Sequence, residues 1–473
     1  MPARDTVRRL IYRATIALLS SSPILVMAQE PAGSGPAQSE VELTLPQAQE
    51  VARNALKLGQ PTLARNIAFG LLQADANSGF AHYVIATAEG QLGRPEQAEK
   101  AAAKAYRFAN TRVQHYEAAQ LAARMYFKAQ KPTRAQLWLR RAIHHAPDAQ
   151  TEAQLERDYK AVRAQNPLSF SIRSGLRPSN NVNSGADSGL QIIDGLPYVG
   201  TLSGSAQALS GLIAHVDGNL SYRLRGDQRS RTEIDARIYV KRVSLDSDAK
   251  SLSPDIRDSD FSSTYSTLGL THAVKWGPRD GVSRMGLRYG QYWSAGTQNY
   301  DFVRLEGGHS WRIGGSSRLS LTANYEARNS AAADSFDTEL LSIGLGARRP
   351  LANGDAISLA LNLRKTFGDL ANSQSEGMAI SAGYSLGEQV GPVILSGGVT
   401  IGHADYPDYT SLFVVPGGRQ DLSLSAHVDM IFPDFDYAGF APSLRVATSR
   451  TKSNVSRFET RELSVALSIQ SKF

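Results

Sequence analysis

The feature that most constrains the fold is a series of long segments, from Leu168 onward, in which apolar and polar residues alternate. Residues 212–225 and 232–241 show it most clearly, because a turn of only four residues (226–229) separates them. A period of two is typical of β-strands with one apolar and one polar face. We count about 14 such segments, at 168–177, 212–225, 232–241, 261–275, 282–294, 301–312, 317–328, 336–349, 357–364, 376–387, 392–404, 419–431, 439–450 and 458–473.

These segments carry charged residues on their polar face, and most have 10–15 residues. Lipid outside and water inside a closed barrel would satisfy both faces, and closure leaves no unpaired backbone edge in hydrocarbon. Connections after even-numbered strands are short, whereas several after odd-numbered strands are long, as in outer-membrane barrels. We therefore predict an antiparallel transmembrane β-barrel of about 14 strands over residues 166–473. Strand length and the charged inner face argue against a soluble sandwich or propeller.

Aromatic residues near the ends of the segments support a membrane location. Aromatic side chains form girdles at the two interfaces of a membrane barrel. The final residue, Phe473, resembles the terminal aromatic signal for assembly of bacterial outer-membrane proteins. The residues expected in the girdle are Trp276, Trp293, Trp311, Tyr289 and Tyr325.

The first 28 residues have the pattern of a secretory signal peptide. Arg4, Arg8, Arg9 and Arg13 precede the mainly apolar run 14–26, and Val-Met-Ala at 26–28 is a small-x-small cleavage site. The run is too short for a membrane anchor, which needs about 20 apolar residues. Residues 29–44, rich in Pro, Gly, Ser and Gln, are expected to be a flexible lead-in.

Residues 45–165 are predicted to form a periplasmic helical repeat domain. Leu-Gly-Gln-Pro at 58–61 and Leu-Gly-Arg-Pro at 92–95 are 34 residues apart, and Pro132 follows Pro95 by 37. A period of 34 residues with two helices per unit is typical of tetratricopeptide repeats. Small residues recur in step, in the first helices at Ala52, Ala86 and Ala123 and in the second at Ala64, Ala98 and Ala135.

Such a stack presents a concave face formed by the first helix of each pair. This groove is the candidate site for an extended client polypeptide, although the same side chains could be an ordinary solvated helix face. The repeat register places in it Tyr83, Thr87, Gln91, Gln120, Arg124 and Lys128.

The sequence contains no recognisable catalytic or cofactor site. Cysteine is absent, and the net charge of +7 is too modest to require nucleic acid as a partner. Nucleotide-binding, zinc-protease and serine-hydrolase motifs are missing, so we expect no enzyme activity, cofactor or metal. The adjacent His144 and His145 are interpreted as a solvated helix end. The acidic loop 246–260 could bind Ca²⁺ through oxygen ligands, but a solvated outer loop is the preferred interpretation.

Several short motifs resemble the surface lipoprotein assembly modulator (Slam) family, and the order of signal peptide, repeat domain and barrel is also similar. Slam proteins are outer-membrane components of the type XI secretion system, which delivers lipoproteins or soluble proteins to the cell surface. The family has no catalytic residues to transfer. The motifs are Leu176–Asn183, Gly418–Asp421, Gly439–Leu444, Ser449-Arg450, Ser453–Val455, Glu462 and Phe473.

The resemblance predicts a protein translocator in the outer membrane of a Gram-negative bacterium. Its expected partners are a client lipoprotein or secreted protein and outer-membrane lipid, with periplasmic chaperones and the barrel-assembly machinery as further candidates. An exopolysaccharide exporter and a nutrient porin are the alternatives.

Overall fold

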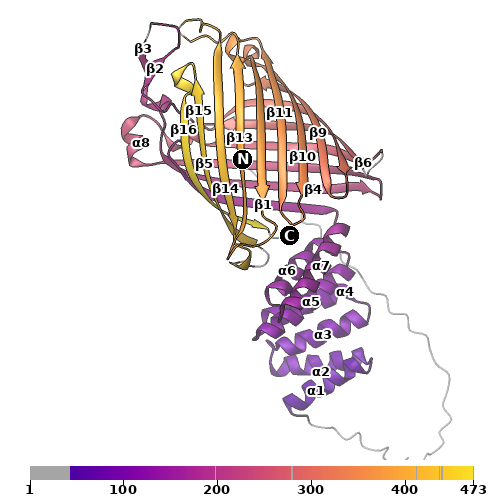
Figure 1. Cartoon of the computed structure of the whole chain (residues 1–473). Coiled ribbons are helices and arrows are strands. Elements are labelled where there is room, and N and C mark those ends of the chain that lie inside the picture. The colour runs from indigo at the N-terminus through magenta and orange to yellow at the C-terminus, as the bar shows by residue number, and fades with distance from the viewer. Residues whose placement is uncertain are drawn as a thin grey trace, which may run out of the picture.

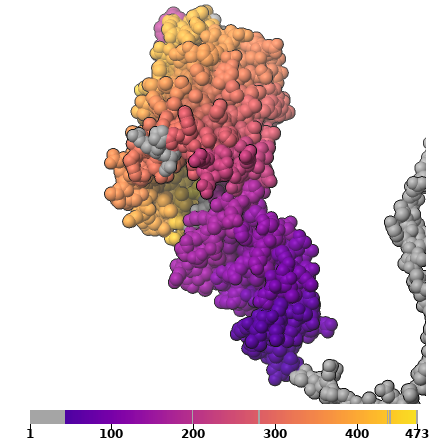
Figure 2. All heavy atoms as spheres, turned by 90° about the vertical axis from the view of Figure 1, so that its right-hand side faces the viewer, coloured from indigo at the N-terminus to yellow at the C-terminus, as the bar shows by residue number. Residues whose placement is uncertain are grey.

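The computed structural model describes residues 43–197, 199–277, 281–411, 413–435, 437 and 440–471. The predicted signal peptide, most of the lead-in and the terminal Phe473 lie outside these residues. The chain forms an N-terminal helical domain and a C-terminal β-barrel, and the helical domain extends from one end of the barrel (Figures 1 and 2).

The helical domain contains antiparallel helices that pack in chain order. Its three hairpins are α1–α2, α3–α4 and α5–α6, and α7 follows them and leads into the barrel. No helix in the described residues is both long and apolar enough to cross a membrane. The helices are α1 (Leu45–Lys57), α2 (Pro61–Ala74), α3 (Gly79–Gln91), α4 (Pro95–Arg107), α5 (Arg112–Lys128), α6 (Pro132–His144) and α7 (Ala149–Gln165).

The same turn joins the two helices of each hairpin. Gly59, Gly93 and Gln130 each adopt a left-handed backbone, with φ of 71°, 74° and 58°. A proline begins the following helix in each case, where its missing N–H costs no helical hydrogen bond. Glycine adopts positive φ without steric cost, whereas a residue with a Cβ does not. The third turn is therefore strained at Gln130.

The repeated small residues lie where the helices cross. Each has at most 3% of its surface exposed, so the backbones of paired helices approach closely. This burial is what a repeat with two helices per unit requires, while the assignment to the tetratricopeptide class stays a prediction. The residues are Ala52, Ala64, Ala86, Ala98, Ala123 and Ala135.

The predicted barrel is confirmed as a closed antiparallel sheet of 14 strands. Sequential strands are neighbours, and β1 closes the ring by pairing with both β4 and β16. The strands are β1 (Leu168–Ser179), β4 (Gly211–Gly226), β5 (Ser230–Leu245), β6 (Ser263–Lys275), β7 (Val282–Ser294), β8 (Thr297–Ile313), β9 (Ser317–Ser330), β10 (Thr338–Pro350), β11 (Ala356–Gly368), β12 (Ser375–Ser385), β13 (Ile394–Tyr406), β14 (Arg419–Ile431), β15 (Phe440–Ser453) and β16 (Thr460–Ser471).

The outward positions of all 14 strands carry large apolar side chains. Each strand contributes at least one that is more than a third exposed, which would be costly in water and is favourable against hydrocarbon. The barrel therefore spans a membrane. One such residue from each strand, in chain order, is Ile172, Leu220, Ile238, Leu268, Leu287, Leu305, Leu321, Leu345, Leu359, Ile380, Ile401, Leu424, Val446 and Leu467.

The ends of the barrel differ in their connections. The turns at the end next to the helical domain are short, such as residues 227–229 and 314–316. The longest loops lie at the other end, and the loop 180–210 contains a small hairpin, β2 (Leu190–Ile192) and β3 (Val199–Thr201), that the alternation did not predict. This loop packs against the 454–459 loop through a buried group formed by Ile193, Val415 and Val455.

The acidic loop 246–260 is organised by backbone hydrogen bonds. Asp246 caps the short helix α8 (Ser247–Leu252) by accepting from the N–H groups of Asp248 and Ala249. Asp258 accepts from the Leu245 N–H and Asp260 from the Arg257 N–H. In the described residues, no group of three or more acidic or histidine side chains is placed to hold a metal ion. The aspartates have a structural role as caps.

A polar junction joins the two domains. The Arg223 guanidinium of β4 donates to the carbonyl oxygens of Ala164 and Asn166, at 2.9 and 2.6 Å. The Asn166 side chain in turn donates to Gln136 of α6 at 2.9 Å. Hydrogen bonds therefore connect the end of α7 to both the barrel wall and the neighbouring helix α6.

The strained turn provides a test of the repeat register. Replacing Gln130 with glycine should raise the free energy of unfolding of the helical domain by about 1 kcal/mol, whereas Gly93→Gln should lower it by a similar amount. Urea unfolding of the full chain in detergent, followed by circular dichroism at the helix band, measures both. Equal effects of the same sign would contradict a shared turn geometry.

Candidate functional site

The barrel lumen has two different walls. On β1 and β4–β9 the inward positions include many charged and aromatic side chains, whereas on β10–β13 they are mostly Gly, Ala, Ser and Thr. Cross-strand register places these residues on one face, because partners in an antiparallel pair point the same way. The first group is called the charged wall and the second the small-residue wall below.

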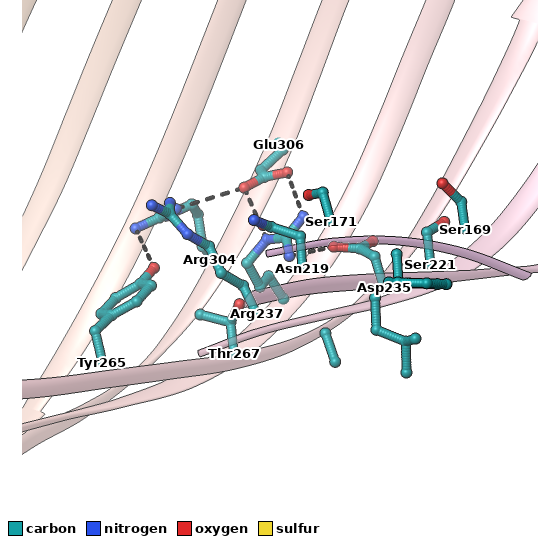
Figure 3. Close-up of a pocket in the computed structure, with 14 residues that line it drawn as sticks. Ser169, Ser171, Asn219, Ser221, Asp235, Arg237, Tyr265, Thr267, Arg304 and Glu306 are labelled. Carbon is teal, nitrogen blue, oxygen red and sulfur yellow. Dashed lines mark hydrogen bonds and ion pairs between the residues drawn. The ribbon is translucent and has the colours of Figure 1, made fainter. Parts of the chain in front are cut away.

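A continuous chain of ion pairs crosses the charged wall from β5 to β9. Arg288 binds Asp235 and Glu306, the latter at 3.1 Å, and Arg304 joins Glu306 to Glu326. Arg328 binds the other oxygen of Glu326, whose surface is only 1% exposed. Part of this chain lines a cavity of about 350 Å³ together with Tyr265, Asn219 and Arg237 (Figure 3).

Asp217 ties the first three strands of the charged wall together. Arg237 of β5 binds it in a bidentate manner at 2.9 and 3.1 Å, and Arg173 of β1 approaches at 3.1 Å. Asn219 donates to the same carboxylate at 3.2 Å. Paired in this way, a buried carboxylate can remain charged.

The closing seam between β1 and β16 is held by side chains as well as backbone. The two strands pair only at residues 174–176 and 179 of β1, whereas β1 pairs with β4 along its whole length. Arg177 spans the seam to Glu462, and Ser179 donates to the same carboxylate at 2.8 Å. Inside the seam, Arg173, Arg177, His215 and Lys241 line a cavity of about 690 Å³.

An aromatic group lies beside the ion-pair chain. Phe302 is fully buried, stacks on Tyr265 with ring centroids 5.7 Å apart, and lies under the Arg304 guanidinium at 5.0 Å. Space for its ring comes from Gly290 on the neighbouring strand, where a Cβ would lie 2.3 Å from the ring. The wall is thus packed and rigid at this point.

The small-residue wall carries few long side chains toward the lumen, and Arg348 and Arg364 are among them. Together the two walls form a polar path suited to a hydrated solute or an extended chain. The inward residues of this wall include Gly344, Gly346, Ser358, Ala360, Ala379, Ser381, Gly383, Gly398, Thr400 and Gly402.

The predicted groove residues occupy two neighbouring first helices. Tyr83, Thr87 and Gln91 lie on α3, and the other three lie on α5. The Tyr83 phenol is raised in pKa by burial and by nearby Glu117, and Arg124 acts on it in the opposite direction. Tyr83 and Arg124 are therefore within electrostatic range across α3 and α5. Thr87 donates its hydroxyl to the Tyr83 carbonyl at 3.0 Å, while Gln91, Arg124 and Lys128 are exposed and Gln120 is half-buried.

The interpretation of His144 and His145 as a solvated helix end is wrong. Both side chains are half-buried, and His145 stacks on His115 with centroids 4.9 Å apart. Burial, followed by the neighbouring His144, lowers the pKa of His145. The ring centroids of His144 and Tyr437, which lies in a barrel turn, are 4.7 Å apart. The two histidines therefore belong to the junction between the domains.

Several residues that carry the resemblance to the Slam family meet at the loop-rich end of the seam, whereas Phe440–Leu444 lies at the other end, where β15 begins. Asn180 accepts from the Leu463 N–H at 2.8 Å, and Asn181 donates to the Gly185 carbonyl at 2.9 Å. Asn454 donates to the Gly418 carbonyl at 2.7 Å. These contacts hold the loops over the seam, while Gly439 and Phe473 lie outside the described residues.

The alternation predicted which residues face the lumen, but not the chain of ion pairs. Paired residues such as Asp235 and Arg288 lie on different strands, 53 positions apart. Their pairing depends on strand register, which a period of two does not determine. The Arg-x-Glu spacing of Arg304 and Glu306 was a weak signal, because same-face neighbours of opposite charge suit a lumen network.

No family profile matches the chain, and no curated protein matches it. Among solved structures, the COG4313 outer membrane channel from Pseudomonas putida F1 is 10% identical, with a TM-score of 0.34, covering 64% of this chain and 96% of that one.

Two further solved structures show a similar degree of likeness. Pseudomonas putida OprB at high pH is 10% identical with a TM-score of 0.35, covering 66% and 96% of the two chains. A bacterial polysaccharide outer membrane secretin is 8% identical with a TM-score of 0.33, covering 64% and 98%. Sequence identities and TM-scores this low support no inference about the substrate. The barrel assignment therefore rests on its own strand order and faces, and the Slam resemblance stays a prediction.

The buried carboxylate at the centre of the ion-pair chain can be tested directly. Glu326→Gln should destabilise the barrel by about 3 kcal/mol, because Arg328 loses its charged partner and Arg304 loses one of two at a buried site. The measurement is the temperature at which the purified barrel loses its folded mobility on SDS gels. Glu376→Gln is the matched control, since its pair with Lys365 is exposed and should matter little. Equal shifts in the two variants would contradict a structural ion-pair chain.

Proposed function

We propose that this chain is an outer-membrane transporter that moves a protein client from the periplasm to the cell surface or medium. The observation that carries the proposal is a closed membrane barrel with a polar lumen, joined at one mouth to a helical repeat domain. A barrel alone would serve diffusion of small solutes. The added domain supplies a binding surface on the side where the short turns lie.

The groove chemistry favours a polypeptide client. Amide, hydroxyl, phenol and cationic groups from α3 and α5 can bind the backbone and side chains of an extended segment. In this proposal the groove receives the client and the lumen provides or gates its route. The helical domain would then lie in the periplasm, since short turns face that side in outer-membrane barrels.

The partners follow from this role and are proposed with it. A lipoprotein or soluble protein is the client, outer-membrane lipid surrounds the barrel, and periplasmic chaperones and the barrel-assembly machinery deliver or assist. The Slam-like order of domains supports this choice over an exopolysaccharide exporter or a nutrient porin.

Protease shaving of intact cells, with and without the protein, tests the proposal. We expect one or a few proteins to disappear from the surface or medium and to accumulate in the periplasm when the protein is absent. The combined variant Tyr83→Ala and Arg124→Glu should reduce surface delivery at least fivefold, while Lys100→Ala, an exposed charge on the second helix α4, should not. An unchanged protein set with loss of a surface glycan would overturn the proposal in favour of polysaccharide export.

A further inference from the structure

Three arginines stand side by side on the lumen face at the mouth next to the helical domain. Arg312 of β8 is directly opposite Arg318 of β9, and Arg318 is directly opposite Arg348 of β10. Residues directly opposite in an antiparallel pair have Cβ atoms about 5 Å apart, and like charges there are destabilising. The two opposite residues Arg318 and Arg348 are called the arginine row below.

This row departs from the way the barrel treats its other inward arginines. In the described part of the chain, neither Arg318 nor Arg348 forms an ion pair, and both are exposed. Arg284 and Arg364 also face the lumen without a carboxylate, but neither stands opposite another arginine. Examples of inward arginines that bind a carboxylate are Arg173, Arg177, Arg231, Arg237, Arg288, Arg304, Arg328, Arg419 and Arg445.

The position of the row makes it accessible to solutes from the helical-domain side. Arg312 and Arg318 flank the tight turn 314–316, and Arg348 lies near the end of β10. These strands lie across the ring from β1, where the helical domain is attached (Figure 1). A solute passing through this mouth would meet the row before the ion-pair chain.

We propose that the arginine row is an anion-binding site at the mouth of the lumen. Its ligands are groups with several negative oxygens, either phosphates or carboxylates. An anion between the guanidinium groups replaces their mutual repulsion with charge-assisted hydrogen bonds, and each guanidinium can offer two parallel donors. The site would concentrate anionic groups of the cargo where they enter the barrel.

Isothermal titration calorimetry of the purified full chain in detergent tests the site at about 50 mM salt. Tripolyphosphate and citrate are the probes, and their relative affinity distinguishes phosphate from carboxylate recognition. The variant Arg318→Gln with Arg348→Gln should bind the preferred probe about tenfold more weakly, and wild-type binding should weaken as salt rises.

Arg349→Gln is the matched control, because Arg349 is the next residue of the same strand and points to the opposite face of the sheet. It should change the affinity less than about twofold. Removing the like-charge contacts should leave the double variant at least as heat-stable as wild type, so a folding defect is not expected. No binding of either probe to wild type, or equal binding to the double variant, would overturn the proposal. Calorimetry tests only the anion site, whereas protease shaving of cells tests whether the client is a protein. Failure of one proposal can therefore be distinguished from failure of the other.

Discussion

The structure depends above all on satisfying backbone hydrogen bonds in a medium that offers no partners. Hydrocarbon cannot hydrogen-bond an open sheet edge, so a sheet that spans it must close. Closure here requires β1 and β16, the first and last strands of the barrel, to pair although nearly the whole barrel sequence separates them. Backbone pairing at this seam is incomplete, and Arg177, Ser179 and Glu462 contribute side-chain bonds to it. The asparagines of the 180–185 loop extend this fastening beyond the strands.

Closure also creates an interior in which charges must be paired. The arginines and carboxylates of the charged wall neutralise one another across β1 and β4–β9, which keeps these strands rigid and leaves few charges free to bind cargo. The small-residue wall supplies the open space. A lumen with one side of long, paired side chains and one side of mostly small residues therefore arises from an uneven distribution of side-chain length.

Much of this was predictable because period and face are local properties of the sequence. The alternation predicted 14 strands, and the structure has 14 in the closed ring. Repeat spacing likewise located the hairpin turns at Gly59, Gly93 and Gln130. The pairing of Asp235 with Arg288 and the contact of His144 with Tyr437 were not predictable, because each joins elements distant in sequence. The hairpin β2–β3 was missed because its three-residue strands are too short for a period to show.

The most direct test of the two-walled lumen uses the absence of cysteine from the chain. Single cysteines can be placed at two neighbours on β12: Ala379, which belongs to the small-residue wall and faces the lumen, and Ile380, which faces the lipid. In proteoliposomes, a water-soluble maleimide that cannot cross lipid should label Ala379→Cys and spare Ile380→Cys. Labelling of Ile380→Cys alone, or equal labelling of both, would contradict a water-filled path along this wall.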